Sequence, residues 1–164
     1  MKTAIWAVAM CAAVLSISAV AHDQPAAKAA KQPVTISPGD LKWGPAPAAF
    51  PPGAQLAVLH GDPSKKTLFA LRFKMPDGYR IAPHWHSQDE ELTVLAGTLM
   101  LGVGDKEGDA HALETGAYHF LPGKMHHYAS AKADTILEIH GLGPLDIHYL
   151  NPSDDPSKAP AASK

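Results

Sequence analysis

The sequence predicts an all-β fold, a double-sheet jelly roll or a small barrel, on the strength of three observations. The chain contains 15 prolines and 13 glycines in 164 residues, which is too many for long helices. Short runs rich in β-branched and aromatic residues recur along it. Turn signals such as Pro76-Asp77-Gly78 and Pro122-Gly123 separate these runs. Many short strands joined in this way are typical of closed or double-sheet folds.

Ten segments have the composition of strands. In chain order they are residues 54–60, 67–73, 79–83, 90–95, 98–103, 110–114, 117–121, 126–129, 135–140 and 146–150. The segment WGPAPAAFPPG, residues 43–53, precedes them and is too rich in proline for a central strand. We expect it to be an irregular arm that packs across the sheet rather than a second domain.

The first 21 residues are predicted to be a secretory signal peptide. Lys2 is followed by an apolar run that ends in Ala19-Val20-Ala21, the small-x-small form that a signal peptidase accepts. Cleavage after Ala21 would start the mature chain at His22 and make it periplasmic or secreted. The alternative is an uncleaved membrane anchor, although the run is near the lower limit of roughly 17 to 25 residues for a spanning helix. After cleavage we expect no stable membrane insertion.

The two ends of the mature chain differ in composition from its middle. Residues 22–33 and 151–164 are rich in Ala, Pro, Lys, Ser and Asp, and we expect a flexible linker and a flexible tail there. A single domain is therefore expected at residues 34–150. The only cysteine, Cys11, lies in the predicted signal peptide, so metal ligands of the mature chain must be His, Asp or Glu.

The charge pattern argues against nucleic-acid binding. One of the 14 basic residues, Lys2, lies in the predicted signal peptide, which leaves 13 basic against 16 acidic residues. Lysines and arginines form no cluster, whereas phosphate neutralisation needs a concentrated basic face. Histidine is the compositional anomaly, because all ten histidines follow residue 21.

The stretch HWHSQDE, residues 84–90, can bring two imidazoles and a carboxylate to one point. Side chains alternate between the faces of a strand, so His84 and His86 point the same way. Glu90 can join them after a short turn. Leu92 and Val94 follow Glu90 at the same two-residue spacing and are therefore expected on the same face of the strand. They predict an apolar surface beside the cluster that would contact a substrate with hydrophobic surface.

Two segments resemble the two motifs of the cupin superfamily. Residues 78–97 match the first motif, G-x5-H-x-H-x3-4-E-x6-G, at every defined position. Residues 116–131 resemble the second motif, G-x5-P-x-G-x2-H-x3-N, except that Lys124 stands where glycine is usual and Ala131 where asparagine is frequent. The resemblance implies the cupin double-stranded β-helix, a jelly-roll barrel, in a single-domain exported protein of unassigned activity.

The resemblance also implies a set of four metal ligands, which are His84, His86, Glu90 and His127. Glu91 is the competing carboxylate, but its count to Gly97 is one short and its strand parity is opposite. His126 and His127 point to opposite faces, so only one of them can serve, and the motif spacing selects His127. Three imidazoles and a carboxylate suit one divalent ion, Fe, Mn, Ni, Cu, Co or Zn, and leave one or two positions open for substrate or dioxygen.

Other side chains are candidates for roles around the metal. Glu90 would act as a catalytic proton acceptor if it left the metal, and His140 would act as an acid–base or supporting group. Arg80 shares the parity of the metal-ligand histidines and would hold an anionic group of the substrate. Tyr118 and Phe120 would line the substrate pocket. The alternatives are surface exposure for Arg80 and His140 and ordinary core packing for Tyr118 and Phe120.

The expected function is that of an exported metal-binding cupin, and among enzymes we place a dioxygenase that acts on a small organic molecule first. Isomerase or lyase chemistry stays open. The alternative is a non-catalytic cupin that binds or senses a small ligand or a metal, because one fold hosts many functions. A purely structural metal is the third interpretation. The resemblance leaves a homodimer, formed through sheet edges, open as well.

Overall fold

The computed structural model describes residues 32–158, which form nine β-strands and three short 3-10 helices and contain no α-helix. This confirms the all-β prediction. The predicted signal peptide, residues 22–31 of the predicted linker and residues 159–164 of the predicted tail lie outside the described residues. Nothing within residues 32–158 is a helix of the length and hydropathy that would cross a membrane.

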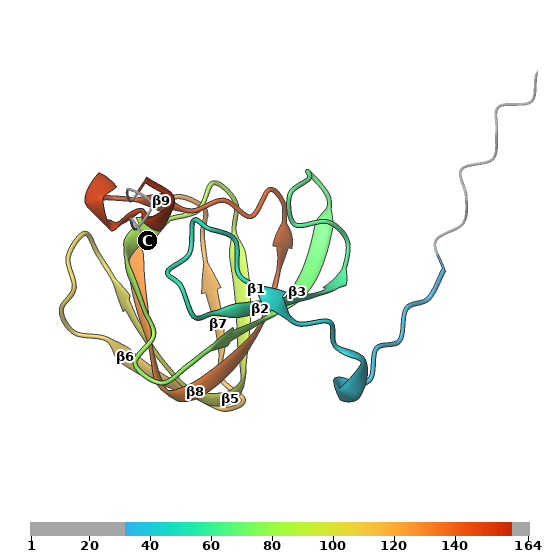
Figure 1. Cartoon of the computed structure of the whole chain (residues 1–164). Coiled ribbons are helices and arrows are strands. Elements are labelled where there is room, and N and C mark those ends of the chain that lie inside the picture. Colours follow the sequence, from blue (N-terminus) through green and yellow to red (C-terminus); the bar gives the residue numbers. More distant parts are fainter. Residues whose placement is uncertain (1–31, 159–164) are drawn as a thin grey trace, which may run out of the picture. The chain divides into compact units, whose positions relative to one another are not determined.

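The strands form one curled antiparallel sheet (Figure 1). They are β1 (Gly44–Pro45), β2 (Gln55–His60), β3 (Leu68–Met75), β4 (Arg80–Trp85), β5 (Glu90–Val103), β6 (His111–Glu114), β7 (Tyr118–Leu121), β8 (His127–Leu142) and β9 (His148–Tyr149). The 3-10 helices are η1 (Pro38–Asp40), η2 (Pro152–Asp154) and η3 (Pro156–Lys158). Hydrogen-bonded neighbours follow the order β1-β2-β3-β8-β4-β9, and β5 pairs with β6, β7 and β8. This curled sheet is the jelly-roll barrel that the sequence predicts.

Two pairs of predicted strands are single long strands. Residues 90–95 and 98–103 belong to β5, and residues 126–129 and 135–140 belong almost entirely to β8. The residues between them are bends in paired strands rather than turns. Gly97 in β5 has a φ of 74°, Ala133 in β8 has a φ of 67°, and the register of the two strands shifts on either side of Ala96. Irregular positions of this kind bend a strand and increase its twist.

The bend is closely packed around Gly97. A Cβ atom on this residue would lie 2.4 Å from the carbonyl oxygen of Asp134 and 2.6 Å from the hydroxyl of Thr135. Thr135 is fully buried, and its hydroxyl accepts a hydrogen bond from the Thr98 N–H at 3.2 Å. Only glycine combines the positive φ with the missing side chain that this contact requires.

The bend is what creates an interior site. Glu90 begins β5, and Val103 at the other end of β5 pairs with His127, the first residue of β8. A straight strand would separate Glu90 from Val103 by about 43 Å, at roughly 3.3 Å per residue. The Glu90 Oε2 and His127 Nε2 atoms are nevertheless 3.9 Å apart. The curl of β5 and β8 therefore brings opposite ends of the strand pair to one point inside the barrel.

Alternating side chains of the strands fill the rest of the interior. In β3, Leu71, Phe73 and Met75 are at most 2% exposed, while the residues between them face outward. Leu99 from β5 and Leu137 from β8 join the same core. Burying one such large apolar side chain contributes about 1.5–3 kcal/mol. The interior next to the site is therefore apolar.

The predicted arm, residues 43–53, lies against the barrel and is irregular except for β1. Gly44 in β1 pairs with Leu56 of β2. Further along, the hydroxyl of Tyr149 donates to the carbonyl oxygen of Ala49 at 2.9 Å, and the hydroxyl of Tyr79 donates to that of Pro51 at 2.6 Å. The arm is thus fixed at both of its ends.

Candidate metal centre

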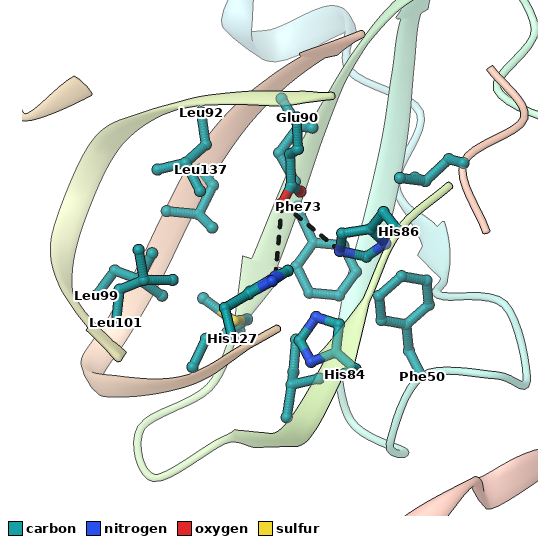
Figure 2. A pocket seen from close by; sticks show the side chains of 15 residues that line it. Phe50, Phe73, His84, His86, Glu90, Leu92, Leu99, Leu101, His127 and Leu137 are labelled. Atoms are coloured by element: carbon teal, nitrogen blue, oxygen red, sulfur yellow. Dashed lines mark ion pairs between the residues drawn. The ribbon is translucent and has the colours of Figure 1, made fainter. Parts of the chain in front are cut away.

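Three histidines converge inside the barrel. His84 lies in β4, His86 directly follows this strand, and His127 begins β8, where its backbone pairs with that of His84. Each offers a ring nitrogen, and the three nitrogens lie within 4.8 Å of one another. The residues are 2%, 7% and 3% exposed, respectively. Figure 2 shows the three rings turned toward a common point.

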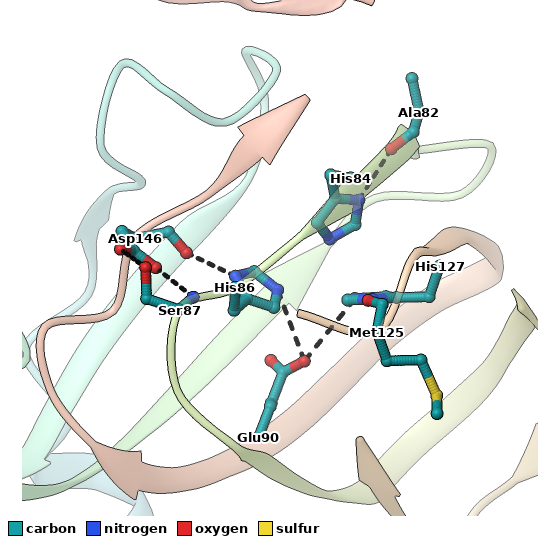
Figure 3. A network of polar contacts seen from close by, with 8 residues as sticks. All are labelled: Ala82, His84, His86, Ser87, Glu90, Met125, His127 and Asp146. Atoms are coloured by element: carbon teal, nitrogen blue, oxygen red, sulfur yellow. Dashed lines mark hydrogen bonds and ion pairs between the residues drawn. The ribbon is translucent and has the colours of Figure 1, made fainter. Parts of the chain in front are cut away.

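The hydrogen bonds of the three rings fix which nitrogen faces the cluster. The Nδ1 atom of His84 lies 2.7 Å from the Ala82 carbonyl oxygen, and that of His127 lies 3.0 Å from the Met125 carbonyl oxygen. The Nδ1 atom of His86 contacts the Asp146 carbonyl oxygen (Figure 3). A carbonyl oxygen can only accept, so each Nδ1 carries the hydrogen and each Nε2 presents a lone pair. This arrangement is typical of metal-ligating histidines.

Glu90 completes the cluster from the first position of β5. Its Oε2 atom lies 3.6 Å from His86 Nε2 and 3.9 Å from His127 Nε2, and the residue is 9% exposed. Ligand atoms on one ion, with bonds of about 2.1 Å, are separated by roughly 3.0–3.4 Å in octahedral or tetrahedral geometry. A shift of a few tenths of an ångström would bring the carboxylate to that separation. The three imidazoles could therefore hold one divalent ion of the borderline class, and the Glu90 carboxylate lies beside two of them.

Burial favours the neutral form of two of the imidazoles, those of His84 and His127. Burial lowers the pKa of His84 well below its ordinary value, and the neighbouring His127 and His86 rings lower it further. Burial also lowers the pKa of His127, and the negative charge of Glu90 opposes this only in part. Neutral imidazole is the form that binds a metal, so both rings are ready to bind at neutral pH.

An internal cavity of about 40 Å³ adjoins the cluster. One water molecule needs about 10–15 Å³, so the cavity is a few times the size of a water molecule and suits only a compact ligand. Its polar lining consists of the three histidines and Glu90, whose side chains point toward one another (Figure 2). Every other lining residue is apolar, including Phe50, Phe73, Leu92 and Leu145.

The structure brings some predicted site residues together and separates others. Leu92 lines the cavity as expected, whereas Val94 is fully buried in the core and does not reach it. Tyr118 and Phe120 are 58% and 45% exposed and lie outside the cavity, which corrects their expected place. The physical reason is strand parity, because it is Leu121 that faces the interior from β7.

Arg80 and His140 also lie outside the cavity. Arg80 is exposed, and its guanidinium forms an ion pair with Glu107. His140 is exposed as well, and its ring contacts Glu138 at 3.2 Å on the outer face of β8. In each case the neighbouring residue, Ile81 or Ile139, occupies the inward position and lines the cavity. Neither residue is placed to touch a ligand bound in the cavity.

The alternatives to Glu90 and His127 face away from the cluster. Glu91 is exposed and pairs with Phe120 of β7. His126 is half-buried, and its ring lies 2.6 Å from a carboxylate oxygen of Asp105. Trp85, between His84 and His86 in the sequence, stacks on His148 with ring centroids 4.0 Å apart. Strand parity therefore separates the cluster residues from their neighbours in the sequence.

Sequence reasoning missed two residues of the site. The Asp146 carboxylate accepts hydrogen bonds from Ser87 N–H at 2.8 Å and from the Ser87 hydroxyl at 2.5 Å, while its carbonyl oxygen meets His86 (Figure 3). Phe50 reaches the cavity from the arm. The available signal for Phe50 was that it is one of two large aromatic side chains, with Trp43, in a segment of Pro, Ala and Gly. Asp146 gave no signal that spacing could reveal.

The curled barrel has the fold of solved cupin structures, and it holds a buried cluster of three histidines. Residues 14–147 match the model of a family described as a domain of unknown function, DUF4437, and the chain belongs to this family. No curated protein matches the sequence.

Several solved structures are similar in fold. The polyketide cyclase RemF from Streptomyces resistomycificus shares 16% identity over 77% of this chain and 92% of its own, with a TM-score of 0.66. A putative acetylacetone dioxygenase from Methylibium petroleiphilum shares 21% sequence identity over 79% of this chain and 88% of its own, with a TM-score of 0.61. An acetylacetone dioxygenase from Acinetobacter johnsonii shares 22% sequence identity over 78% of this chain and 83% of its own, with a TM-score of 0.58. At these identities the likeness shows the fold alone.

Proposed function

We propose that this protein is a metal-dependent enzyme, dioxygenase-like in its chemistry, that acts on a small neutral organic molecule. The observation that carries the proposal is the set of three buried imidazoles whose Nε2 atoms face an apolar cavity. His84, His86, Glu90 and His127 would hold one divalent ion. When bound, the ion would act as a Lewis acid and as a template that orients oxygen atoms of the substrate.

The residues of the chain define what such a site accepts. Among the described residues that line the cavity, none is a lysine or an arginine, so the metal ion would be the only cationic partner of a substrate carboxylate or phosphate. The apolar walls, such as Phe73 and Leu137, exclude water and favour a hydrophobic body. Glu90 lies beside His86 and His127 and would accept a proton from a substrate group there if it left the metal. A compact enol or diketone meets these conditions.

Two proteins of similar fold are described as acetylacetone dioxygenases, one of them putative, and this supports 1,3-diketones as the first compounds to test. We would load the chain with Fe(II) and measure oxygen consumption with acetylacetone. Metal content would be compared with that of a His84→Ala, His127→Ala double variant. His126→Ala is the matched control, because His126 is adjacent in sequence and turned away from the cluster.

The expected result is about one metal ion per chain, lost in the double variant and kept in His126→Ala, with oxygen consumed only by the loaded native chain and this control. Metal binding that is unchanged in the double variant would overturn the site. Metal bound at the site without turnover of any diketone or phenol would instead support a non-catalytic binding or sensing protein.

We also propose that the chain is exported and cleaved after Ala21. The support is the apolar run of the first 21 residues and its small-x-small end. Mass spectrometry of the protein recovered from an exporting bacterial host tests this, and the expected mature chain begins at His22. A recovered chain that still begins at Met1 and stays in the membrane fraction would favour the anchor.

A further inference from the structure

Phe50 is the one residue of the proline-rich arm that reaches the metal cavity. Its side chain lines the cavity together with those of His84 and His86, on the side where these two rings lie (Figure 2). Its ring packs on Phe73, with centroids 5.1 Å apart and planes inclined by 51°. Phe50 therefore forms a wall between the metal-binding groups and the outside of the barrel.

The backbone on both sides of Phe50 is held by hydrogen bonds from the barrel. Tyr149 donates to the carbonyl oxygen of Ala49, directly before Phe50, at 2.9 Å. Tyr79 donates to the carbonyl oxygen of Pro51, directly after Phe50, at 2.6 Å. The prolines of the arm restrict its backbone further. Two tyrosines thus clamp the residues that flank one ring, and this fixes where the ring can lie.

One of these two tyrosines, Tyr149, lies beside the metal-binding residue His84. Tyr149 pairs with His84 between β9 and β4, and the two rings are 6.0 Å apart. Burial raises the pKa of Tyr149 and that of Tyr79 well above the ordinary value, so both hydroxyls stay protonated donors over the physiological range. A displacement of the arm would therefore disturb the packing beside His84.

We propose that Phe50 is the specificity-determining residue of this cavity. Its ring limits the length of the ligand that fits beside the three histidines, and Tyr79 and Tyr149 hold it in that position. The inference rests on the proposed function in that the cavity is taken as the ligand site. The Phe50 ring is part of the wall of this cavity of about 40 Å³, and replacing Phe50 by alanine would add the space of a benzene ring.

The test compares Phe50→Ala with Trp43→Ala. Trp43 is a second half-buried aromatic residue of the same arm, and it does not line the cavity. In the first measurement, benzene is titrated into the metal-free proteins by calorimetry, which needs no metal and no activity. We expect Phe50→Ala to bind benzene with a Kd at least tenfold below that of the native chain and of Trp43→Ala. Equal benzene affinity in all three proteins would overturn the inference.

The second measurement uses Co(II)-loaded proteins and records the absorption spectrum during titration with acetylacetone and with benzoylacetone, which carries an additional phenyl ring. We expect the ratio of the two Kd values to shift at least tenfold toward benzoylacetone in Phe50→Ala and to stay unchanged in Trp43→Ala. An unchanged ratio in Phe50→Ala, with acetylacetone still bound, would overturn the inference and leave the proposed function standing. Benzene bound by Phe50→Ala alone, with no diketone bound by any form, would refute the diketone substrate and keep the role of Phe50.

A third variant covers the case in which Phe50→Ala does not fold. The double variant Tyr79→Phe, Tyr149→Phe keeps the Phe50 ring and both aromatic side chains, and removes only the two hydroxyls that hold the arm. We expect benzoylacetone to bind this protein more tightly than the native chain, with acetylacetone affinity changed less than twofold. Native affinity for both compounds would show that the clamp does not hold the ring.

Discussion

Replacing Gly97 by alanine would test whether the bend in β5 is what creates the metal centre. Gly97 has a φ of 74°, and a Cβ there would lie 2.4 Å from the Asp134 carbonyl oxygen and 2.8 Å from the Cα of Thr135. Gly78 provides the matched control. Its φ is also 74°, but a Cβ on Gly78 would meet nothing within 4 Å. The two substitutions share the backbone strain and differ only in the contact.

The expected destabilisation can be worked out from these contacts. An alanine in the left-handed region costs about 1–2 kcal/mol, and the lower conformational entropy of the unfolded chain returns about 0.4–1 kcal/mol. Both variants should therefore lose about 1 kcal/mol. At Gly97 the contact with backbone atoms of β8 adds an overpacking cost of about 1–3 kcal/mol. The difference between the variants is then about 1–3 kcal/mol, or roughly 4–12 °C in Tm for a domain of this size.

Urea and thermal unfolding of the metal-free native chain and both variants measure this difference. Metal titration follows on each folded protein, because a distorted bend would move Glu90 away from His127. We expect Gly97→Ala to bind metal more weakly than Gly78→Ala. Equal losses of stability in the two variants would refute the reasoning, since the contact would then have no energetic effect.

Three further predictions concern Lys124, the pair Tyr79 and Tyr149, and zinc binding. Lys124 has a φ of 67°, so Lys124→Gly should raise the free energy of unfolding by up to about 1 kcal/mol in urea denaturation, whereas Lys124→Val should lower it. The pKa values of Tyr79 and Tyr149 are raised in the folded chain, so the stability these groups contribute is present below pH 10 and lost as the pH rises above it. Thermal unfolding between pH 8 and 11.5 should show this loss, and Tyr79→Phe should reduce it. Zn(II) at about 100 times its Kd should stabilise the native chain by about 2.7 kcal/mol and should not stabilise His84→Ala.

The parts of the fold that follow local rules could be predicted from the sequence. Strand parity placed His84, His86 and Glu90 on one side because these residues lie within seven positions of one another. His127 lies far away in the sequence, and its place depended on the resemblance to the second cupin motif. The unusual Lys124 of that motif keeps the positive φ that glycine would adopt, and its N–H donates to the His86 carbonyl oxygen at 2.7 Å. The turn before His127 is therefore retained without the glycine.

The predictions that were wrong or missing concern contacts between residues far apart in the sequence, which no local sequence pattern encodes. Which face of β7 looks inward depends on the pairing of Leu121 with Glu90, and a shift of one residue would have turned Phe120 inward instead. From the sequence alone, Gly97 indicates a turn between two strands. In the structure the pairing of β5 with β8 continues past Gly97, so this residue lies at a bend within one strand. Phe50 reaches the cavity because Tyr149, about a hundred residues later, holds the arm. Such long-range contacts are set by the closure of the barrel.

The hydrogen bonds that orient the three histidine rings come from different parts of the chain, and this difference predicts a specific role for Asp146. His84 and His127 each donate to a carbonyl oxygen two residues earlier in the chain, whereas His86 donates to that of Asp146, 60 residues away. The Asp146 carboxylate fixes this segment by accepting from Ser87 N–H and from the Ser87 hydroxyl.

Asp146→Ala should therefore leave the barrel folded but release the His86 ring, and metal affinity should fall by about 10- to 100-fold in a chelator competition assay. Asp105→Ala is the control, because that exposed carboxylate contacts His126 beside a cluster residue and supports no cluster ring. If the two variants bound metal equally well, the orientation of His86 would not depend on the segment before β9. A loss confined to Asp146→Ala would mean that the metal centre is completed by a residue far outside both sequence motifs.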